Sequence, residues 1–218
     1  MNLFRLLQER EAVGRPVRVG LIGAGKFGTM FLAQAQRMAG LQVVGVADLS
    51  VERARDACLR AGWPPERLAA AATAGAIADV ARTGRTALTG SAGELIASDL
   101  EVVVEATGST EAGVRHALAA IGAGRHLVMV TVEADVLVGP ALKRRAEKAG
   151  VIYSLAYGDQ PALICELVDW ARAVGFEVVA AGKGTKYLPE YQASTPETVF
   201  DHYGFTPEQV ARGEFNAR

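Results

Sequence analysis

Cysteine is scarce in this sequence, which restricts the kinds of stabilising and metal-binding sites that it can contain. Among 218 residues there are two cysteines, Cys58 and Cys165, and they belong to no CxxC or Cys/His cluster. The sequence therefore indicates neither a disulfide framework nor a zinc site. We expect no metal, and two buried thiols in a reducing, cytoplasmic protein.

Charge of one sign and long apolar runs are lacking too. The 23 basic and 24 acidic residues leave a formal net charge of -1, so no basic surface for nucleic acid or for an anionic membrane is expected. No stretch approaches the ~18 apolar residues that span a bilayer. The charged residues 1–15 contain no apolar core of signal-peptide length. These absences predict a soluble protein whose partner is a small molecule, with no nucleic acid and no membrane.

Short apolar runs alternate with helical patterns along most of the chain, and half of the residues are hydrophobic. The runs predict strands, and apolar residues at helical spacing predict helices. Strands are expected over 17–22, 42–47, 86–89, 102–106, 126–131, 151–155 and 176–181, and helices over 3–12, 27–38, 51–61, 68–82, 111–121, 140–149 and 161–173. Such alternation predicts a Rossmann-type α/β fold, a doubly wound parallel sheet with helices on both faces.

A glycine-rich loop, Gly23-Ala24-Gly25-Lys26-Phe27-Gly28, follows the first predicted strand and opens a helix. A GxGxxG pattern alone is weak evidence, because a structural turn without ligand also fits it. In this βαβ context Gly23 would allow the tight turn, Gly25 the approach of a pyrophosphate, and Gly28 close helix–strand contact. Free N–H groups at the helix start would hold the diphosphate. The loop therefore predicts binding of NAD or NADP.

Asp48 lies 20 residues after Gly28, at the end of the second predicted strand. A carboxylate there can accept hydrogen bonds from the adenosine ribose and repel a 2′-phosphate, which favours NAD. Arg53 and Arg55 could neutralise such a phosphate, so NADP remains open. Alternatively Asp48 caps the next helix, although Ser50 could cap it instead.

Two further strand ends carry small or acidic residues. Ala106, Thr107 and Gly108 would let a cofactor ribose or nicotinamide lie against the backbone, and the residues after them could also simply cap a helix. Glu133 and Asp135 follow the next strand, where they either orient a polar substrate or are solvated loop acids.

The last candidates lie nearer the carboxyl end. Asp159 precedes a predicted helix, where it caps the helix or orients the substrate. Lys183 stands between two glycines at the end of the last predicted strand. Its ammonium could polarise a substrate carbonyl or donate a proton, or it could belong to an exposed turn.

The domain organisation that follows has three parts. Residues 1–15 are an N-terminal helix, and 16–182 are the NAD(P)-binding Rossmann domain. Residues 183–218 carry only short helical patterns, over 196–202 and 207–212. They are an irregular extension, or the start of a substrate domain that is missing from this chain.

Several segments together resemble the homoserine-dehydrogenase-like oxidoreductases that carry a C-terminal SAF domain. These segments are the run 17–28, then 105–108, 126–129, 132–135, 139–140, 150–154 and 181–184. The reductoisomerase-like branch, which acts on 1-deoxy-D-xylulose 5-phosphate, has similar segments. The resemblance implies an NAD(P)-dependent oxidoreductase of which this chain supplies the cofactor domain. Members of that family continue into a substrate and oligomerisation domain, so a homo-oligomer is also expected.

The leading hypothesis is hydride transfer to or from a small polar hydroxy or oxo compound, with Lys183 assisting the oxygen and Glu133 or Asp159 orienting the substrate. A second hypothesis is a regulatory module that senses NAD(H) without turning it over. A third is an α/β domain for another nucleotide such as CoA.

Overall fold

The computed structural model describes residues 2–156, 160–182, 188–204 and 206–211. The chain divides into two compact units, Met1–Leu167 and Val168–Arg218.

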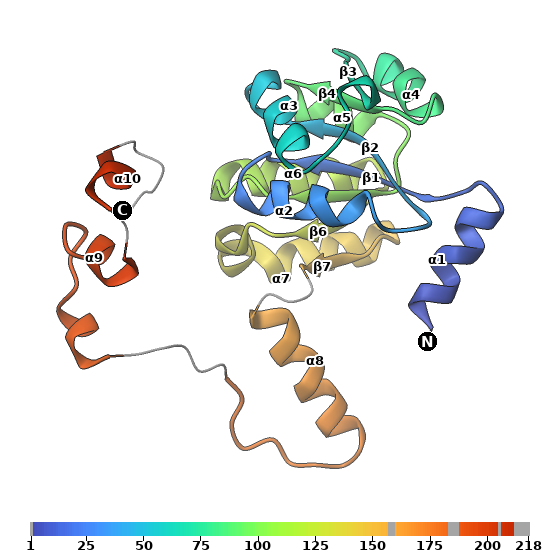
Figure 1. Cartoon of the computed structure of the whole chain (residues 1–218). Helices are drawn as coiled ribbons and strands as arrows, with labels where there is room; N and C mark the ends of the chain where they lie inside the picture. Colours follow the sequence, from blue (N-terminus) through green and yellow to red (C-terminus); the bar gives the residue numbers. More distant parts are fainter. Residues whose placement is uncertain (1, 157–159, 183–187, 205, 212–218) are drawn as a thin grey trace. The chain divides into compact units, whose positions relative to one another are not determined.

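The first unit contains a seven-stranded sheet in which every strand pair is parallel (Figure 1). Its order is β3-β4-β2-β1-β5-β6-β7. β2, β3 and β4 lie on one side of β1, and β5, β6 and β7 lie on its other side, so the direction of winding reverses between β1 and β5. Ligands of open α/β sheets bind at such a switch point, beyond the carboxyl ends of the strands. The strands are β1 (Val17–Ile22), β2 (Leu41–Ala47), β3 (Leu68–Ala70), β4 (Thr86–Thr89), β5 (Val102–Glu105), β6 (His126–Met129) and β7 (Tyr153–Leu155).

Helices cover both faces of this sheet, because successive strand side chains point to opposite sides. Val43 packs in one apolar cluster with Leu32, and the next residue, Val44, packs in the other with Leu95. The predicted doubly wound Rossmann fold is confirmed. The first cluster takes in α2 (Lys26–Ala35) and α3 (Val51–Arg60), and the second α4 (Ala74–Arg82), α5 (Ala92–Ala97), α6 (Thr110–Gly122) and α7 (Val132–Ala149).

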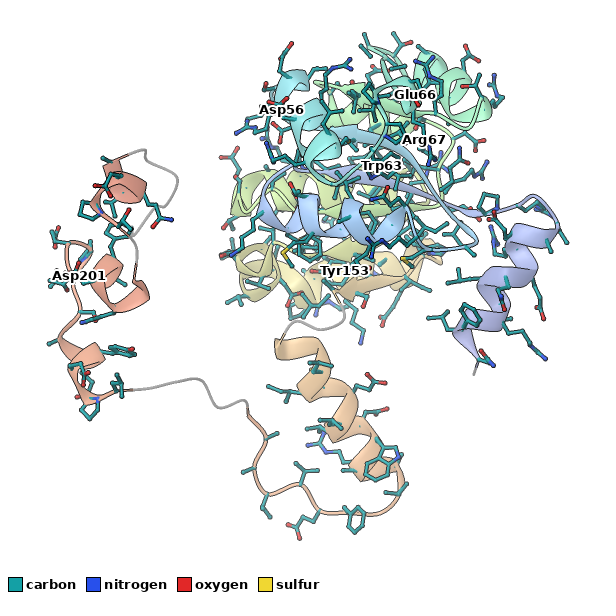
Figure 2. The ribbon with its side chains drawn as sticks, viewed as in Figure 1. Asp56, Trp63, Glu66, Arg67, Tyr153 and Asp201 are labelled. Atoms are coloured by element: carbon teal, nitrogen blue, oxygen red, sulfur yellow. The ribbon has the colours of Figure 1, made fainter. Side chains whose placement is uncertain are left out.

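Trp63, which follows α3, packs against α2 and holds the segment after α3 in place (Figure 2). Its ring is 4% exposed, and its indole Nε1 donates a hydrogen bond to the Leu32 carbonyl oxygen at 3.0 Å. Arg67, in the short 3-10 helix η1 (Pro65–Arg67), places its guanidinium 5.0 Å from the ring centroid. A buried aromatic ring with its N–H satisfied and a cation over its face is a stable anchor.

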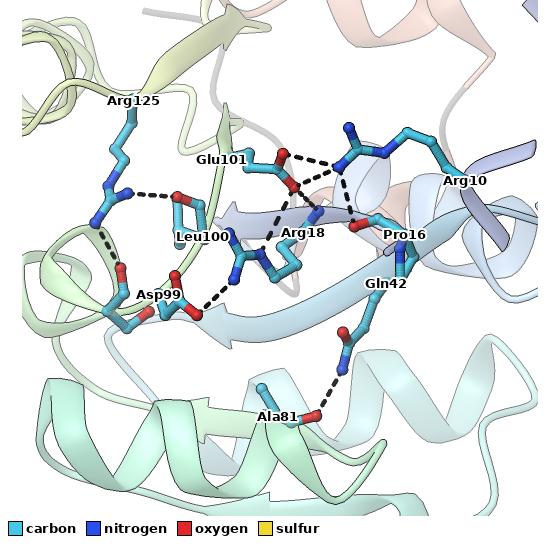
Figure 3. Close-up of polar contacts among 10 residues, drawn as sticks. Arg10, Pro16, Arg18, Gln42, Ala81, Asp99, Leu100, Glu101 and Arg125 are labelled. Carbon is cyan, nitrogen blue, oxygen red and sulfur yellow. Dashed lines mark hydrogen bonds and ion pairs between the residues drawn. The ribbon is translucent and has the colours of Figure 1, made fainter. Parts of the chain in front are cut away.

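An ionic cluster at the amino-terminal edge of the sheet holds α1 (Leu3–Ala12) and the starts of β1 and β5 together (Figure 3). Arg10 Nη2 donates to Glu101 Oε1 at 2.9 Å, and the Arg18 backbone N–H donates to Glu101 Oε2 at 3.0 Å. Partial burial by itself raises the pKa of Glu101, but these bonds and the two arginine charges bring it below its ordinary value.

Gly40, in the turn before β2, lies directly against the backbone of α1. It has φ +73°, and a Cβ at this position would overlap with the carbonyl oxygen of Leu7. Only glycine therefore allows the turn before β2 to pack directly against the backbone of α1.

The expected helix over 68–82 is wrong in its first half. Leu68–Ala70 form β3, which pairs with β4, and α4 starts only after Thr73. The Thr73 side chain accepts a hydrogen bond from the Ala76 N–H and so caps α4. Pairing with a neighbouring strand overrides the helix propensity of the alanines.

The strand expected over 176–181 is also wrong. The structure gives residues 176–182 no regular conformation, and Val179 is 89% exposed. A strand needs a neighbour for its backbone hydrogen bonds, and among the described residues the sheet ends at β7. Helix α8 (Gln160–Ala173) includes the residues at which the two units meet in sequence. The remaining described elements are short: η2 (Pro189–Ala193), α9 (Val199–Tyr203) and α10 (Pro207–Ala211).

Two smaller expectations need correction. The helix predicted over 140–149 begins at Val132, with Pro140 inside it. Of the two thiols expected to be buried, Cys58 is buried and Cys165 is exposed.

Candidate cofactor site

The three glycines of the loop differ in what surrounds them. Gly23 has φ +103°, and a Cβ there would overlap with the Ala106 carbonyl oxygen and lie 2.9 Å from the Thr107 nitrogen. A Cβ at Gly28 would overlap with the Gly23 carbonyl oxygen, so α2 packs tightly on the turn. A Cβ at Gly25 would meet nothing within 4 Å. Protein atoms therefore enclose two of these positions, and the third faces open space in which a ligand would fit.

The start of α2, like that of α7, lacks a side-chain cap. Gly25 is its N-cap residue and provides no side-chain hydrogen bond, its first turn contains no acidic residue, and Lys26 and Phe27 are exposed. A helix start has N–H groups without intrahelical partners and a partial positive charge, which together suit an anion. By contrast, hydroxyl side chains cap α3, α4, α5 and α6, namely Ser50, Thr73, Ser91 and Ser109.

Asp48 turns its carboxylate toward the glycine loop. Its Oδ2 accepts from the Ala24 N–H at 2.9 Å, and its Oδ1 accepts from the Ser50 N–H at 3.1 Å and from Arg53 Nε at 2.8 Å. Ser50, whose hydroxyl accepts from the Arg53 N–H at 3.2 Å, is the N-cap of α3. The alternative role of Asp48 as the cap is therefore wrong.

The same bonds determine the charge of Asp48. Burial alone raises the pKa of this carboxyl, but the N–H groups of Ala24 and Ser50 and the Arg53 guanidinium outweigh that effect and lower it. Asp48 is thus ionised at neutral pH. Since a carboxylate accepts at about four lone-pair sites, about one remains for a ribose hydroxyl.

The turn after β5 lies directly beside the glycine loop. The Ala106 N–H donates to the Ile22 carbonyl oxygen at 2.8 Å, which extends the pairing of β5 with β1. Gly108 has φ +69°, and its N–H donates to Thr131 Oγ1 at 3.0 Å. Asp48, the glycine loop and the 106–108 turn therefore follow one another along the carboxyl edges of β2, β1 and β5, as the path of an extended dinucleotide requires. These residues fit the cofactor that the loop predicts.

Glu105, the last residue of β5, is a feature that the sequence reasoning missed. Its side chain is fully buried, and it accepts hydrogen bonds from Thr107 Oγ1 at 2.6 Å and Thr131 Oγ1 at 2.5 Å, with His116 Nδ1 at 3.2 Å. Burial raises the pKa of Glu105, but these partners together lower it. A glutamate at the end of an apolar strand could have indicated a buried polar network, because a buried carboxylate requires polar partners.

Among the candidate substrate-orienting residues, Glu133 and Asp135 both belong to the first turn of α7. Glu133 lies exposed in the first turn of α7, after β6. Asp135 Oδ1 accepts a hydrogen bond from the Tyr153 hydroxyl at 2.7 Å, and burial together with this carboxylate raises the pKa of Tyr153. Asp159 and Lys183 lie outside the described residues.

Within the described ranges, no helix has the length and apolar character needed to cross a lipid bilayer. The same residues include no group of three or more His, Cys, Asp or Glu side chains that could hold a metal ion.

Comparison with protein families fits this geometry. Residues 17–157, more than half of the chain, match the model of the GFO/IDH/MocA family, described as an oxidoreductase family with an NAD-binding Rossmann fold. The chain belongs to this family. Residues 158–218 of this GFO/IDH/MocA oxidoreductase match a second model, described as the catalytic domain of oxidoreductase DRL. The predicted oxidoreductase class and NAD-binding fold are confirmed. No curated protein sequence matches the chain.

The solved structures to which the chain is similar are distant in sequence. An NAD binding oxidoreductase from Klebsiella pneumoniae is 19% identical, with a TM-score of 0.49 over 73% of this chain and 39% of its own. A homoserine dehydrogenase from Thiobacillus denitrificans is 20% identical, with a TM-score of 0.48 over 64% and 29%. The WlbA dehydrogenase from Bordetella pertussis, solved with NADH and UDP-GlcNAcA, is 21% identical, with a TM-score of 0.48 over 74% and 43%. This chain spans less than half of the length of each.

Proposed function

We propose that this GFO/IDH/MocA oxidoreductase chain binds NAD at the carboxyl edge of β2, β1 and β5, and that it serves hydride transfer to or from a small polar hydroxy or oxo compound. The sequence resemblance adds that the enzyme is of the homoserine-dehydrogenase-like group with a SAF domain. The observation that carries the proposal is the open space at Gly25, beside a helix start without a side-chain cap.

The roles of the cofactor-binding residues follow from their bonds. The N–H groups at the start of α2 hold the diphosphate, and the remaining lone pair of Asp48 accepts from the adenosine ribose. Ala106, Thr107 and Gly108 present backbone to the nicotinamide half. The nicotinamide, when bound, supplies the carbon that gives or takes the hydride.

The catalytic roles are proposed from the sequence. Lys183 assists the substrate oxygen, by polarising it or by giving it a proton, and Glu133 or Asp159 orients the substrate. Lys183 and Asp159 belong to the part of the chain that matches the DRL catalytic domain, which supports their assignment.

The cofactor site is tested by titrating the full chain with NADH and comparing two glycine variants. Gly25→Ala adds a methyl group where a ligand would lie, and Gly122→Ala, at the end of α6 and the opposite edge of the sheet, also adds one in open space. We expect Gly25→Ala to weaken NADH binding about tenfold or more, with unfolding free energy within about 1 kcal/mol of wild type. Gly122→Ala should bind NADH normally. Equal affinity in the two variants would overturn the proposed site.

Turnover separates an enzyme from a sensor. Intact protein with NADH or NAD is presented with hydroxy and oxo compounds while absorbance of the reduced nicotinamide is followed. We expect turnover that Lys183→Ala abolishes while NADH affinity stays within about twofold. Binding without turnover of any compound would favour the NAD(H)-sensing module instead.

A further inference from the structure

Glu105 has a carboxylate side chain at a buried position of the sheet where its neighbours on the adjacent strands are apolar. It is 0% exposed, and its partners in register across the sheet are Ile22 on β1 and Met129 on β6. Acidic residues are almost never fully buried unless they are paired. Replacing a buried charged group by an apolar one is often neutral or stabilising, so stability alone gives no reason for this carboxylate.

The hydrogen bonds of Glu105 fix two hydroxyl groups in direction. An ionised carboxylate only accepts, so Thr107 Oγ1 and Thr131 Oγ1 must point their hydrogens toward it. Their lone pairs are then available to backbone N–H groups. Thr107 Oγ1 accepts from the Ser109 N–H at 3.3 Å, and Thr131 Oγ1 accepts from the Gly108 N–H at 3.0 Å.

The turn after β5 is therefore held by two chains of hydrogen bonds, here called relays. Each relay runs from a backbone N–H of the turn through a threonine hydroxyl to Glu105. A third contact, from His116 Nδ1 at 3.2 Å, ties α6 to the same carboxylate. The turn in question carries the left-handed Gly108 and meets Gly23 of the glycine loop at Ala106. Glu105 thus sets the position of the turn relative to the loop.

We propose that Glu105 is a positioning residue for the dinucleotide, which acts through Thr107 and Thr131 to hold the 106–108 turn as the support for the nicotinamide-side ribose. The inference rests on the proposed cofactor site. Because both threonine hydroxyls are engaged with Glu105, the turn contacts the ligand with its backbone rather than with the Thr107 side chain.

Two probes distinguish the halves of the site. ADP contains the adenosine and diphosphate that Asp48 and the glycine loop would bind, whereas NADH adds the nicotinamide half. Thr131→Val keeps the shape of the side chain and removes the hydroxyl of one relay. We expect this variant in the full chain to bind NADH roughly tenfold more weakly, to bind ADP within about twofold of wild type, and to regain NADH affinity as Thr131→Ser.

Thr86→Val is the matched control. Thr86 is as deeply buried, and its hydroxyl donates to the Val43 carbonyl oxygen at 2.8 Å in another part of the sheet, so its loss lowers stability without touching the turn. Thr107→Val, at a less buried position, tests the second relay if Thr131→Val does not fold, with the same expected pattern.

The outcomes are distinct. Unchanged NADH affinity in the Thr131→Val or Thr107→Val variant, or an equal loss of NADH and ADP binding, would overturn the positioning role while leaving the site in place. Wild-type chain that binds neither NADH nor ADP would overturn the proposed function as well.

Discussion

Asp48 shares one carboxylate among the glycine loop, the start of α3 and Arg53. Its side chain is 9% exposed, whereas that of Arg53 is 56% exposed. The negative charge that would face a 2′-phosphate is thus partly balanced by a cation that water screens. Preference between NAD and NADP should follow from this one ion pair.

We expect Arg53→Ala to weaken NADPH binding relative to NADH by about threefold, because the Asp48 charge is then uncompensated and the exposed arginine contributes modestly. Asp48→Asn should shift the preference the other way, since it removes the repulsion. Calorimetric titration with both nucleotides measures the ratio. Arg60→Ala, at the far end of α3, is the control and should leave the ratio unchanged. An unchanged ratio in the Arg53→Ala and Asp48→Asn variants would contradict the role of this ion pair.

Single residues differ in how well the sequence foretells them. The role of Gly28 follows from the loop pattern because its constraint, the Gly23 carbonyl oxygen, lies within a few residues along the chain. The same pattern indicates Gly23, although the backbone that encloses Gly23 belongs to the distant turn after β5. The partners of Glu105 come from three segments separated in sequence, the turn after β5, α6 and the start of α7. Only the folded sheet brings them together, so this network could not be foreseen.

At the level of elements, α1 depends on how the turn before β2 is built. Its residues include none that is buried, so little apolar packing holds it. The Arg10–Glu101 pair and the close approach of Gly40 to Leu7 hold it instead. Partly exposed ion pairs contribute little, whereas Gly40 contacts α1 twice: through its close approach to Leu7, and through its N–H, which donates to Glu11 Oε2 at 2.8 Å.

We therefore expect Gly40→Ala to release α1. The substitution costs about 1–2 kcal/mol for the left-handed backbone, and its Cβ overlaps with the Leu7 carbonyl oxygen. Gly84→Ala has a comparable φ of +77° but meets nothing within 4 Å. Hydrogen exchange over residues 3–12 should accelerate in the first variant and not in the second. Equal exchange in both would show that the overlap has no effect.

Elements with strong local patterns are the ones that the sequence predicts. β1, β4 and α1 have the expected bounds. Two of the failures lie where long-range pairing decides: Leu68–Ala70 become a strand because β4 lies beside them, and 176–181 do not, because local β propensity provides no neighbouring strand.

For the whole molecule, three partly or fully buried carboxyls have pKa values below the ordinary ones: Asp48, Glu101 and Glu105. A group whose pKa is lower in the folded state stabilises the fold above its unfolded value and loses this contribution as pH falls through its folded value. The ordinary values are 3.8 for the aspartate and 4.5 for the glutamates.

We expect the contribution of these groups to the unfolding free energy to be constant above pH ~5 and to fall steadily below it. Urea denaturation at several pH values measures this dependence. Glu101→Gln should flatten the acidic limb, since it removes one of the three groups. Stability that is the same at pH 3 as at pH 7 would contradict the assignment.

All strands of the sheet run the same way, so the ionic anchors around Glu101 and the glycine loop lie at opposite rims. Strands of four to six residues separate these rims by roughly 13–20 Å, farther than substitutions usually couple. Substitutions that change stability near Glu101 and substitutions that change nucleotide binding at the glycine loop should therefore have additive effects.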